Sequence, residues 1–235
     1  MEPNGSLNVG SIARLCANFE INELRIISPK CDMYSLEARK MALKGKKYLE
    51  KCKIYNSLEQ AISDCDLVLA TCGRIDLNKD FVCESPEEIS KWISSFDSIN
   101  NLALIFGRED RGLSNRDLLF AHKIINIKTS QSYPSLNLSH AVSIILYELN
   151  KDSSIKTIDE NSTFNLASSK QINDSFLEIE EMLIRIGYLL KHTSYSKIIK
   201  FKKFIYKSET SSHEINVLRG IVHQINWFLN NSRGG

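Results

Sequence analysis

The stretch from residue 102 to residue 149 constrains the fold of this chain most. It holds two apolar segments of strand length, residues 102–106 and 124–127, and each runs into a loop of small or polar residues. Glycines bound the first of these loops, at Gly107 and Gly112, and a short helix follows it. In open α/β sheets, ligands bind in the loops outside the carboxyl ends of the strands. The stretch therefore predicts an α/β fold with a ligand site at the ends of two strands.

Strands and helices alternate along the first 150 residues. We expect strands at residues 24–28, 53–55 and 66–71, and helices at residues 12–19, 35–43 and 86–96, with another helix beginning after Ser57. Asn8 or Ser11 is the expected cap of the first helix, because both residue types accept hydrogen bonds from free helix amides. This alternation predicts a mostly parallel sheet with helices on both faces.

The last third of the chain has a different pattern. Residues 151–169 are rich in Ser, Thr, Asn, Asp and Lys, which is typical of a linker. Beyond them, apolar residues recur in steps of three and four along one helix face: Ile172, Phe176, Ile179, Leu183, Ile186 and Leu190. Two further helices are expected at residues 195–206 and 212–230. We therefore expect an α/β domain over residues 1–150 and a small helical domain over residues 170–235. The apolar face of the helical domain needs a partner, either the first domain or a second copy of itself.

Several classes of protein have no support in the sequence. The six cysteines have no paired or metal-like spacing, so reduced thiols are expected, and the five histidines suggest no metal site. No G-x-G-x-x-G, Walker loop, H-E-x-x-H or G-x-S-x-G is present. No apolar run approaches the ~20 residues of a membrane span, and no signal peptide is evident. We expect a cytoplasmic protein without metal or membrane.

Positive charge is concentrated in two stretches, although the formal net charge is only +2. Residues 191–207 contain six lysines, no acidic residue and several aromatic residues, and residues 39–53 form a second basic stretch. Lysines interleaved with aromatic side chains suit a phosphate backbone and exposed bases. The same pattern also fits an amphipathic helix with the lysines on its solvent-exposed face and the aromatic residues on its buried face. For these stretches alone, RNA contact and a solvated face are both open.

Three motifs appear in order along the chain: Asn8-x-Gly10-Ser11-x-x-Arg14, Phe106-Gly107-x-Glu109-x-x-Gly112-Leu113-Ser114, and Ser135-Leu136-Asn137-Leu138. They resemble the motifs of the SpoU-type RNA ribose 2′-O-methyltransferases of the SPOUT superfamily, and the resemblance covers essentially the whole chain. It implies an α/β-knot fold with a deep trefoil knot, S-adenosylmethionine as cofactor, a homodimer and an RNA substrate. The carboxy-terminal pattern, with lysines before Glu214-x-x-Val217-Leu218-Arg219-Gly220, is similar to the branch that methylates the anticodon-loop cytidine or uridine at position 32 of tRNA.

The resemblance also assigns roles to residues. It implies Arg14 at the reacting hydroxyl, with Asn8 and Glu109 orienting it and Ser135 and Asn137 beside cofactor and RNA. Because a guanidinium stays protonated, orientation and charge stabilisation suit Arg14 better than the role of base. The implied cofactor loops contain Thr71, Cys72, Gly73, Gly107, Ile127, Pro134, Ser135 and Leu136. The implied RNA ligands are Arg14, Lys197, Lys200, Lys202 and Lys203.

One departure from the family pattern concerns the amino terminus. Family members begin with an apolar strand, central to the sheet, and here Met1 takes its last place. Its absence should expose backbone groups and apolar surface. We expect that the true protein starts upstream of Met1; a decayed gene product is the alternative.

Three other functions compete with tRNA ribose methylation. A ribosomal-RNA ribose methyltransferase would use the same site, and the helical tail argues mildly against it. A protein that keeps the fold only to bind RNA would not require Asn8, Arg14, Glu109, Ser135 and Asn137 together. Methylation at a base carbon would need a cysteine nucleophile in a recognisable motif, and none of the six cysteines has one.

Overall fold

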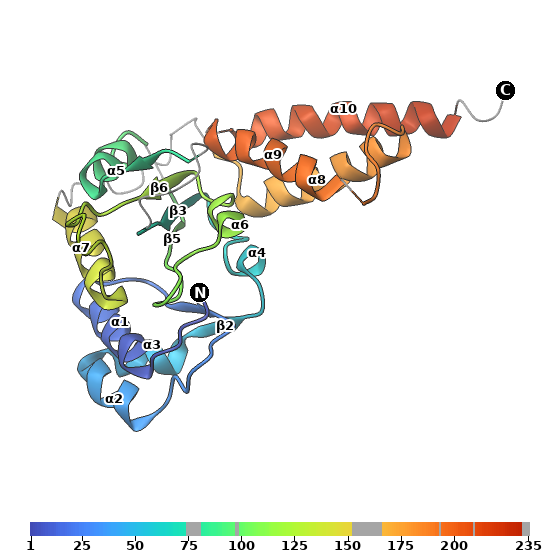
Figure 1. Cartoon of the computed structure of the whole chain (residues 1–235). Helices are drawn as coiled ribbons and strands as arrows, with labels where there is room; N and C mark the ends of the chain where they lie inside the picture. The colour runs from blue at the N-terminus through green and yellow to red at the C-terminus, as the bar shows by residue number, and fades with distance from the viewer. Residues whose placement is uncertain (74–80, 97–98, 152–165, 193, 209, 232–235) are drawn as a thin grey trace.

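The fold is an α/β domain followed by three helices (Figure 1). The computed structural model describes residues 1–73, 81–96, 99–151, 166–192, 194–208 and 210–231. The elements in chain order are α1 (Ser6–Asn18), β1 (Arg25–Ile27), α2 (Leu36–Ala42), the 3-10 helix η1 (Leu43–Gly45), α3 (Lys46–Lys51), β2 (Lys53–Tyr55), α4 (Leu58–Ala61), β3 (Leu67–Thr71), β4 (Cys83–Glu84), α5 (Pro86–Ile93), β5 (Leu102–Ile105), α6 (Asn115–Leu118), β6 (Lys123–Ile125), α7 (Leu138–Lys151), α8 (Ser169–Arg185), α9 (Ser194–Lys207) and α10 (Ser212–Asn231).

All paired strands run parallel, as predicted. One sheet has the order β4-β6-β3-β5, and a second sheet consists of β1 and β2. In the central strand β3, alternate residues face opposite sides: Val68 and Ala70 lie in one apolar cluster, whereas Leu69 lies in another. Helices α5 and α7 cover the Leu69 face, and α4 and α6 cover the other. The expectation of helices on both faces is confirmed.

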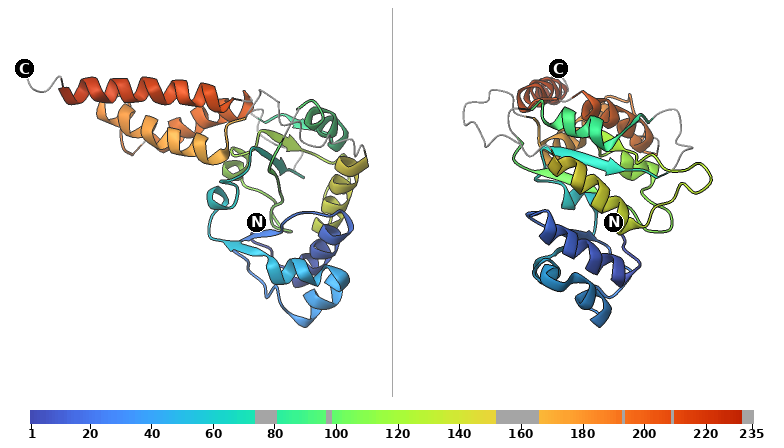
Figure 2. Two further views of the ribbon diagram at one scale, coloured as in Figure 1. Left: turned by 180° about the vertical axis from the view of Figure 1, so that it is seen from behind. Right: turned by 90° about the vertical axis from the view of Figure 1, so that its left-hand side faces the viewer.

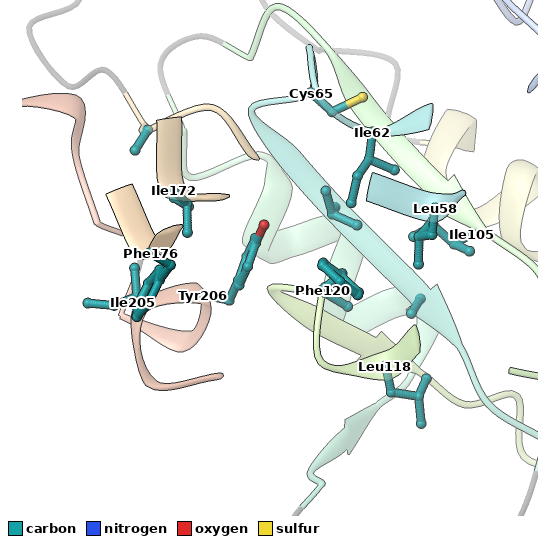
Figure 3. Close-up of a cluster of buried hydrophobic side chains, with 14 of the residues drawn as sticks. Leu58, Ile62, Cys65, Ile105, Leu118, Phe120, Ile172, Phe176, Ile205 and Tyr206 are labelled. Carbon is teal, nitrogen blue, oxygen red and sulfur yellow. The ribbon is translucent and has the colours of Figure 1, made fainter. Parts of the chain in front are cut away.

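The three carboxy-terminal helices share a core with the sheet. Figure 3 shows Tyr206 of α9 lying between Phe176 of α8 and Phe120, which follows α6. Tyr206 is 1% exposed, and its ring meets those of Phe120 and His122 edge-on. The apolar face of α8 therefore finds its partner within the same chain. Most of the expected linker lies outside the described residues, and its last part is ordered, with Leu166 and Ala167 buried.

Two helix boundaries differ from the sequence-based expectation. Helix α1 begins at Ser6, so Asn8 and Ser11 lie within it and neither caps it. Helix α8 ends at Arg185 instead of near Leu190, because Gly187 follows with a φ of +79° and leaves Ile186 and Leu190 exposed. Both differences arise at helix ends, where a single backbone conformation or a distant side chain overrides apolar periodicity.

A groove of about 540 Å³ lies between β1 and β5. Each of these strands has one edge that pairs with no strand in the described part of the chain. Residues 1–3 bridge the two strands: the Met1 amino group donates to the Phe106 carbonyl (2.8 Å) and the Glu2 amide to the Ile27 carbonyl (2.7 Å). The groove lies between the two sheets.

Buried His122 makes the stability of this core sensitive to acid. Its Nδ1 accepts the Val68 amide (3.1 Å), and burial lowers its pKa to about 4. An unfolded histidine titrates near ~6.5, so between these values the unfolded chain binds a proton that the folded chain does not. We expect the free energy of unfolding to fall by about 3 kcal/mol between pH 6.5 and pH 4 from this group alone.

The measurement is urea unfolding across that pH range. In the His122→Asn variant, the side-chain oxygen can still accept from Val68 but does not titrate. The variant should therefore lose part of the acid sensitivity that the parent shows. An identical pH slope in the two proteins would contradict the assignment.

Candidate active site

The predicted site lies where three parallel strands end. β5, β3 and β6 are neighbours in the sheet, and their carboxyl ends lead into the loops that contain Gly107, Cys72 and Asn126. The loops are joined to one another: the Thr71 hydroxyl donates to the Ile105 carbonyl (3.1 Å), and the Cys72 amide to the Ile125 carbonyl (2.9 Å). The strand order thus brings together segments that are more than 30 residues apart in sequence.

The carboxylate of Glu109 holds the start of α1. It accepts from the backbone amides of Asn4 (3.0 Å) and Gly5 (3.1 Å) and from the Asn8 side-chain amide (3.1 Å). Gly5 is the N-cap residue and has no side chain of its own to cap the helix. A carboxylate at a helix amino terminus satisfies free amides and complements the helix dipole. Glu109 therefore caps a helix that lies about a hundred residues away in sequence.

These contacts also define the charge state of Glu109. Burial opposes ionisation, but the hydrogen bonds from Asn4, Asn8 and Gly5 together outweigh it and hold the pKa of this carboxyl below its usual value. An ionised carboxylate that only accepts is a positioning group, since it carries no proton to give at neutral pH.

Asn8 connects Glu109 to the third motif. Its side-chain oxygen accepts from the Asn137 amide nitrogen (3.2 Å). The Asn137 oxygen in turn accepts from the backbone amide (2.8 Å) and the hydroxyl (2.7 Å) of Ser139 at the start of α7. One polar chain thus runs from Glu109 through Asn8 and Asn137, and it ties the starts of α1 and α7 together.

Arg14 and Ser135 are not part of this chain. Arg14 is exposed, and within the described part of the protein it makes no hydrogen bond or ion pair. Six helical residues separate it from Asn8, which is about 9 Å along the axis and roughly 240° around it. The two side chains therefore leave α1 on different sides. Ser135 is exposed two residues before Asn137.

Gly107 is required by the close packing of its own loop. A Cβ at this position would lie 2.1 Å from the Gly112 carbonyl carbon and 2.3 Å from the Leu113 nitrogen. The absent side chain makes room for the loop's own backbone, and the role of Gly107 in holding the cofactor stays a prediction. Two arginines of the same loop are paired, Arg108 with Asp110 (2.8 Å) and Arg111 with Glu2.

The remaining cofactor candidates lie on two adjoining loops. Cys72 is buried, whereas Gly73 is exposed and has open space where a side chain would stand. On the neighbouring loop Ile127 and Pro134 are partly buried and Leu136 is exposed. Residues 74–80, which continue the first loop, lie outside the described residues. The candidates thus offer backbone groups and apolar side chains, with open space beside Gly73.

Sequence reasoning missed two residues that hold these loops. The Asn126 side chain donates to the Cys72 carbonyl (2.7 Å), and the Thr129 hydroxyl donates to the Pro134 carbonyl (2.9 Å). The only signal available was that both are polar and lie within or just beyond the second apolar segment. Position alone does not show which carbonyl such a side chain reaches.

The candidate RNA-binding lysines of α9 divide into two kinds. Lys197 and Lys200 are exposed. Lys202 donates to Asn173 (3.0 Å), lies over the rings of Phe120 and Phe176, and burial lowers its pKa. The ammonium of Lys203 lies 4.3 Å from the ring centre of Phe81. Lys202 therefore holds α9 against α8 and the turn after α6, and its role in RNA binding stays a prediction.

Other chemistries find no support in the described residues. They contain no group of three or more His, Cys, Asp or Glu side chains that could hold a metal ion. None of the described helices is long and apolar enough to cross a membrane.

Comparison with known proteins agrees with the geometry. Residues 1–147 match the sequence model of the SpoU rRNA Methylase family. The tRNA (cytidine-2′-O-)-methyltransferase TrmJ of Sulfolobus acidocaldarius is 34% identical over 230 residues, which cover 96% of this chain and 91% of that protein. The crystal structure of TrmJ from Z. mobilis superposes with a TM-score of 0.82 at 24% identity and covers 96% of both chains. An AdoMet-bound rRNA methyltransferase from Sinorhizobium meliloti gives a TM-score of 0.50 at 20% identity and covers 65% of this chain and 54% of that one.

Proposed function

This chain belongs to the SpoU rRNA methylase family, and on that premise we propose that it transfers the methyl group of S-adenosylmethionine to the ribose 2′-hydroxyl of a pyrimidine in the anticodon loop of tRNA. The observation that carries the proposal is the polar chain Glu109–Asn8–Asn137, which joins all three motifs at the ends of β3, β5 and β6. The tRNA substrate is supported by the TrmJ relative, which aligns over nearly the whole chain.

The reaction needs a better nucleophile than a neutral hydroxyl. The ribose oxygen gains negative charge as its proton leaves, and it must lie close to the methyl group and in line with the breaking bond. Arg14 is exposed and unpaired within the described residues, so its guanidinium is free to bind the RNA phosphate and the reacting oxygen. Its role is to orient the ribose and to stabilise the developing charge.

The loops around Gly73 fit the proposed cofactor. Adenine needs apolar walls and backbone groups for edge hydrogen bonds. The backbone at Gly73 is open to a ligand, and the exposed Leu136 side chain offers apolar surface. When bound, the cofactor would supply an activated methyl group. Asn126 and Thr129 would keep the binding loops in shape, since each fixes a carbonyl of one loop.

A second copy of the chain completes the site in this proposal. Arg14 leaves α1 on a different side from Asn8, so it does not join the polar chain of its own subunit. Large apolar side chains are exposed on the adjoining helices α1 and α7, namely Leu7 (52%), Ile144 (38%) and Tyr147 (58%). A homodimer that packs α1 and α7 together would bury them and would place the partner subunit's Arg14 at the site.

The test is mass spectrometry of nucleosides after the protein acts on unmodified tRNA with S-adenosylmethionine. We expect a 2′-O-methylated cytidine or uridine, and nuclease fragments should place it in the anticodon loop. An equal amount of ribosomal RNA serves as the competing substrate. Methylation of ribosomal RNA alone, or no methylated nucleoside from either RNA, would contradict the proposal.

A further inference from the structure

The second basic stretch of the sequence forms a surface on the helices that pack against α1, which carries Arg14. Residues 39–51 hold six cations and one carboxylate in a chain whose formal net charge is only +2. The six cations lie on α2, η1 and α3 and are all exposed: Arg39, Lys40, Lys44, Lys46, Lys47 and Lys51. We call them, together with Arg14, the α2–α3 basic face. None of the seven forms an ion pair with another residue that the structure describes.

Close backbone packing fixes this face relative to Arg14. A Cβ on Gly10 of α1 would lie 2.3 Å from the Ala38 carbonyl oxygen of α2. A Cβ on Gly45 would lie 2.3 Å from the Ala13 carbonyl oxygen and 2.8 Å from the Arg14 Cα. The backbones of α1, α2 and η1 therefore touch at both glycines. Lys44 and Lys46, which flank Gly45, are held beside the turn of α1 that presents Arg14.

A buried apolar cluster makes this block rigid. Val9 and Ala13 of α1 pack with Ala38 and Ala42 of α2 and with Leu49 of α3, and each is at most 3% exposed. The solvent-exposed side of the same helices carries the cations. In both views of Figure 2, as in Figure 1, α1–α3 lie at the opposite end of the molecule from α8–α10. The α2–α3 basic face is thus separate from the lysines of α9.

We propose that the α2–α3 basic face binds phosphates of the RNA substrate and places the target ribose at Arg14. The inference rests on the proposed function, since it assumes that Arg14 acts on an RNA ribose. Two observations favour RNA over an acidic protein or a lipid surface. The cations share a rigid block with the residue at the reacting hydroxyl. They also outnumber the exposed large apolar residues of α2, η1 and α3, which are Leu36, Met41 and Leu43. Phosphate binding by lysine needs only exposed, uncompensated charge, which this face supplies.

The experiment compares two double variants with equal loss of charge. Lys44→Ala/Lys46→Ala removes the pair beside Arg14. Lys91→Ala/Lys170→Ala removes two exposed lysines from α5 and α8, which belong to no proposed site. Each protein is assayed for tRNA binding by filter retention over a range of salt concentrations, and for KM and kcat of methylation. Thermal unfolding shows that both variants are folded.

We expect the Lys44/Lys46 variant to bind tRNA roughly tenfold more weakly than the Lys91/Lys170 control and to lose about 1.5 from the slope of log K against log salt. Its KM should rise while kcat stays near the parent value. Equal affinity and equal salt slope in the two variants would overturn the proposal. So would a Lys44/Lys46 variant that binds an acidic protein or anionic vesicles more weakly than the control does while its tRNA affinity is unchanged. Because the parent's methylation is measured in the same series, failure of the basic face is distinguishable from failure of the proposed function.

Discussion

Replacing Arg14 by alanine should lower the turnover of tRNA 2′-O-methylation by at least about 100-fold. Arg14 is the one cationic residue of the first motif, and it is exposed on α1. In the proposed reaction its guanidinium stabilises charge that develops only in the transition state. The fall should therefore appear in kcat more than in KM. The melting temperature should stay the same, because the side chain makes no hydrogen bond or ion pair with any residue that the structure describes.

The Arg14→Lys variant is the matched control for charge. Lysine keeps the positive charge but lacks the planar fork that binds two oxygens together, so we expect partial activity between parent and alanine variant. Full kcat in the alanine variant would remove Arg14 from the reacting centre. A lower melting temperature would instead indicate that Arg14 has a structural role.

Replacing Glu109 by alanine should damage both stability and activity. The substitution leaves the amides of Asn4 and Gly5 and the side chain of Asn8 without their acceptor. Because these groups are partly open to water, we expect a loss of about 1–3 kcal/mol in the free energy of unfolding. Activity should fall further than stability explains, since Asn8 would lose the group that aims it at Asn137.

The adjacent carboxylate gives a matched control for this prediction. The Asp110 side chain is 56% exposed and forms a surface ion pair with Arg108, so Asp110→Ala should change the unfolding free energy by less than about 1 kcal/mol. Urea unfolding of both variants, with methylation assayed under native conditions, measures the difference. Equal free energies of unfolding and equal methylation activities in the two variants would show that Glu109 does not cap α1.

The sequence predicted the local elements of the α/β domain well, because apolar alternation and turn residues encode them directly. The strands around residues 53–55, 67–71 and 102–105 lie where expected, and the Ser57 and Ser85 caps explain where α4 and α5 begin. The start of α1 was missed, because its cap is the Glu109 carboxylate. A long-range cap of this kind has no signature near the helix.

The candidate site was predicted in part. The motifs contain Asn8, Glu109 and Asn137, which the structure joins by direct hydrogen bonds. Lys202 illustrates the limit of charge patterning: it reads as a surface lysine, yet α9 turns it towards Phe120 and Phe176. Whether a lysine faces water depends on how helices pack, which the pattern of one helix does not contain. The roles of Arg14 and Ser135, the knot and the dimer stay predictions.

The central claim is that the methyl group goes to a ribose oxygen of tRNA. It is tested most directly with S-adenosylmethionine that carries a deuterated methyl group, followed by tandem mass spectrometry of the product nucleosides. The account predicts the label on the sugar fragment of a pyrimidine nucleoside, with an unlabelled base fragment, and no label in a substrate that has 2′-deoxyribose at the modified position. Label on the base fragment, or transfer to the deoxy substrate, would contradict it.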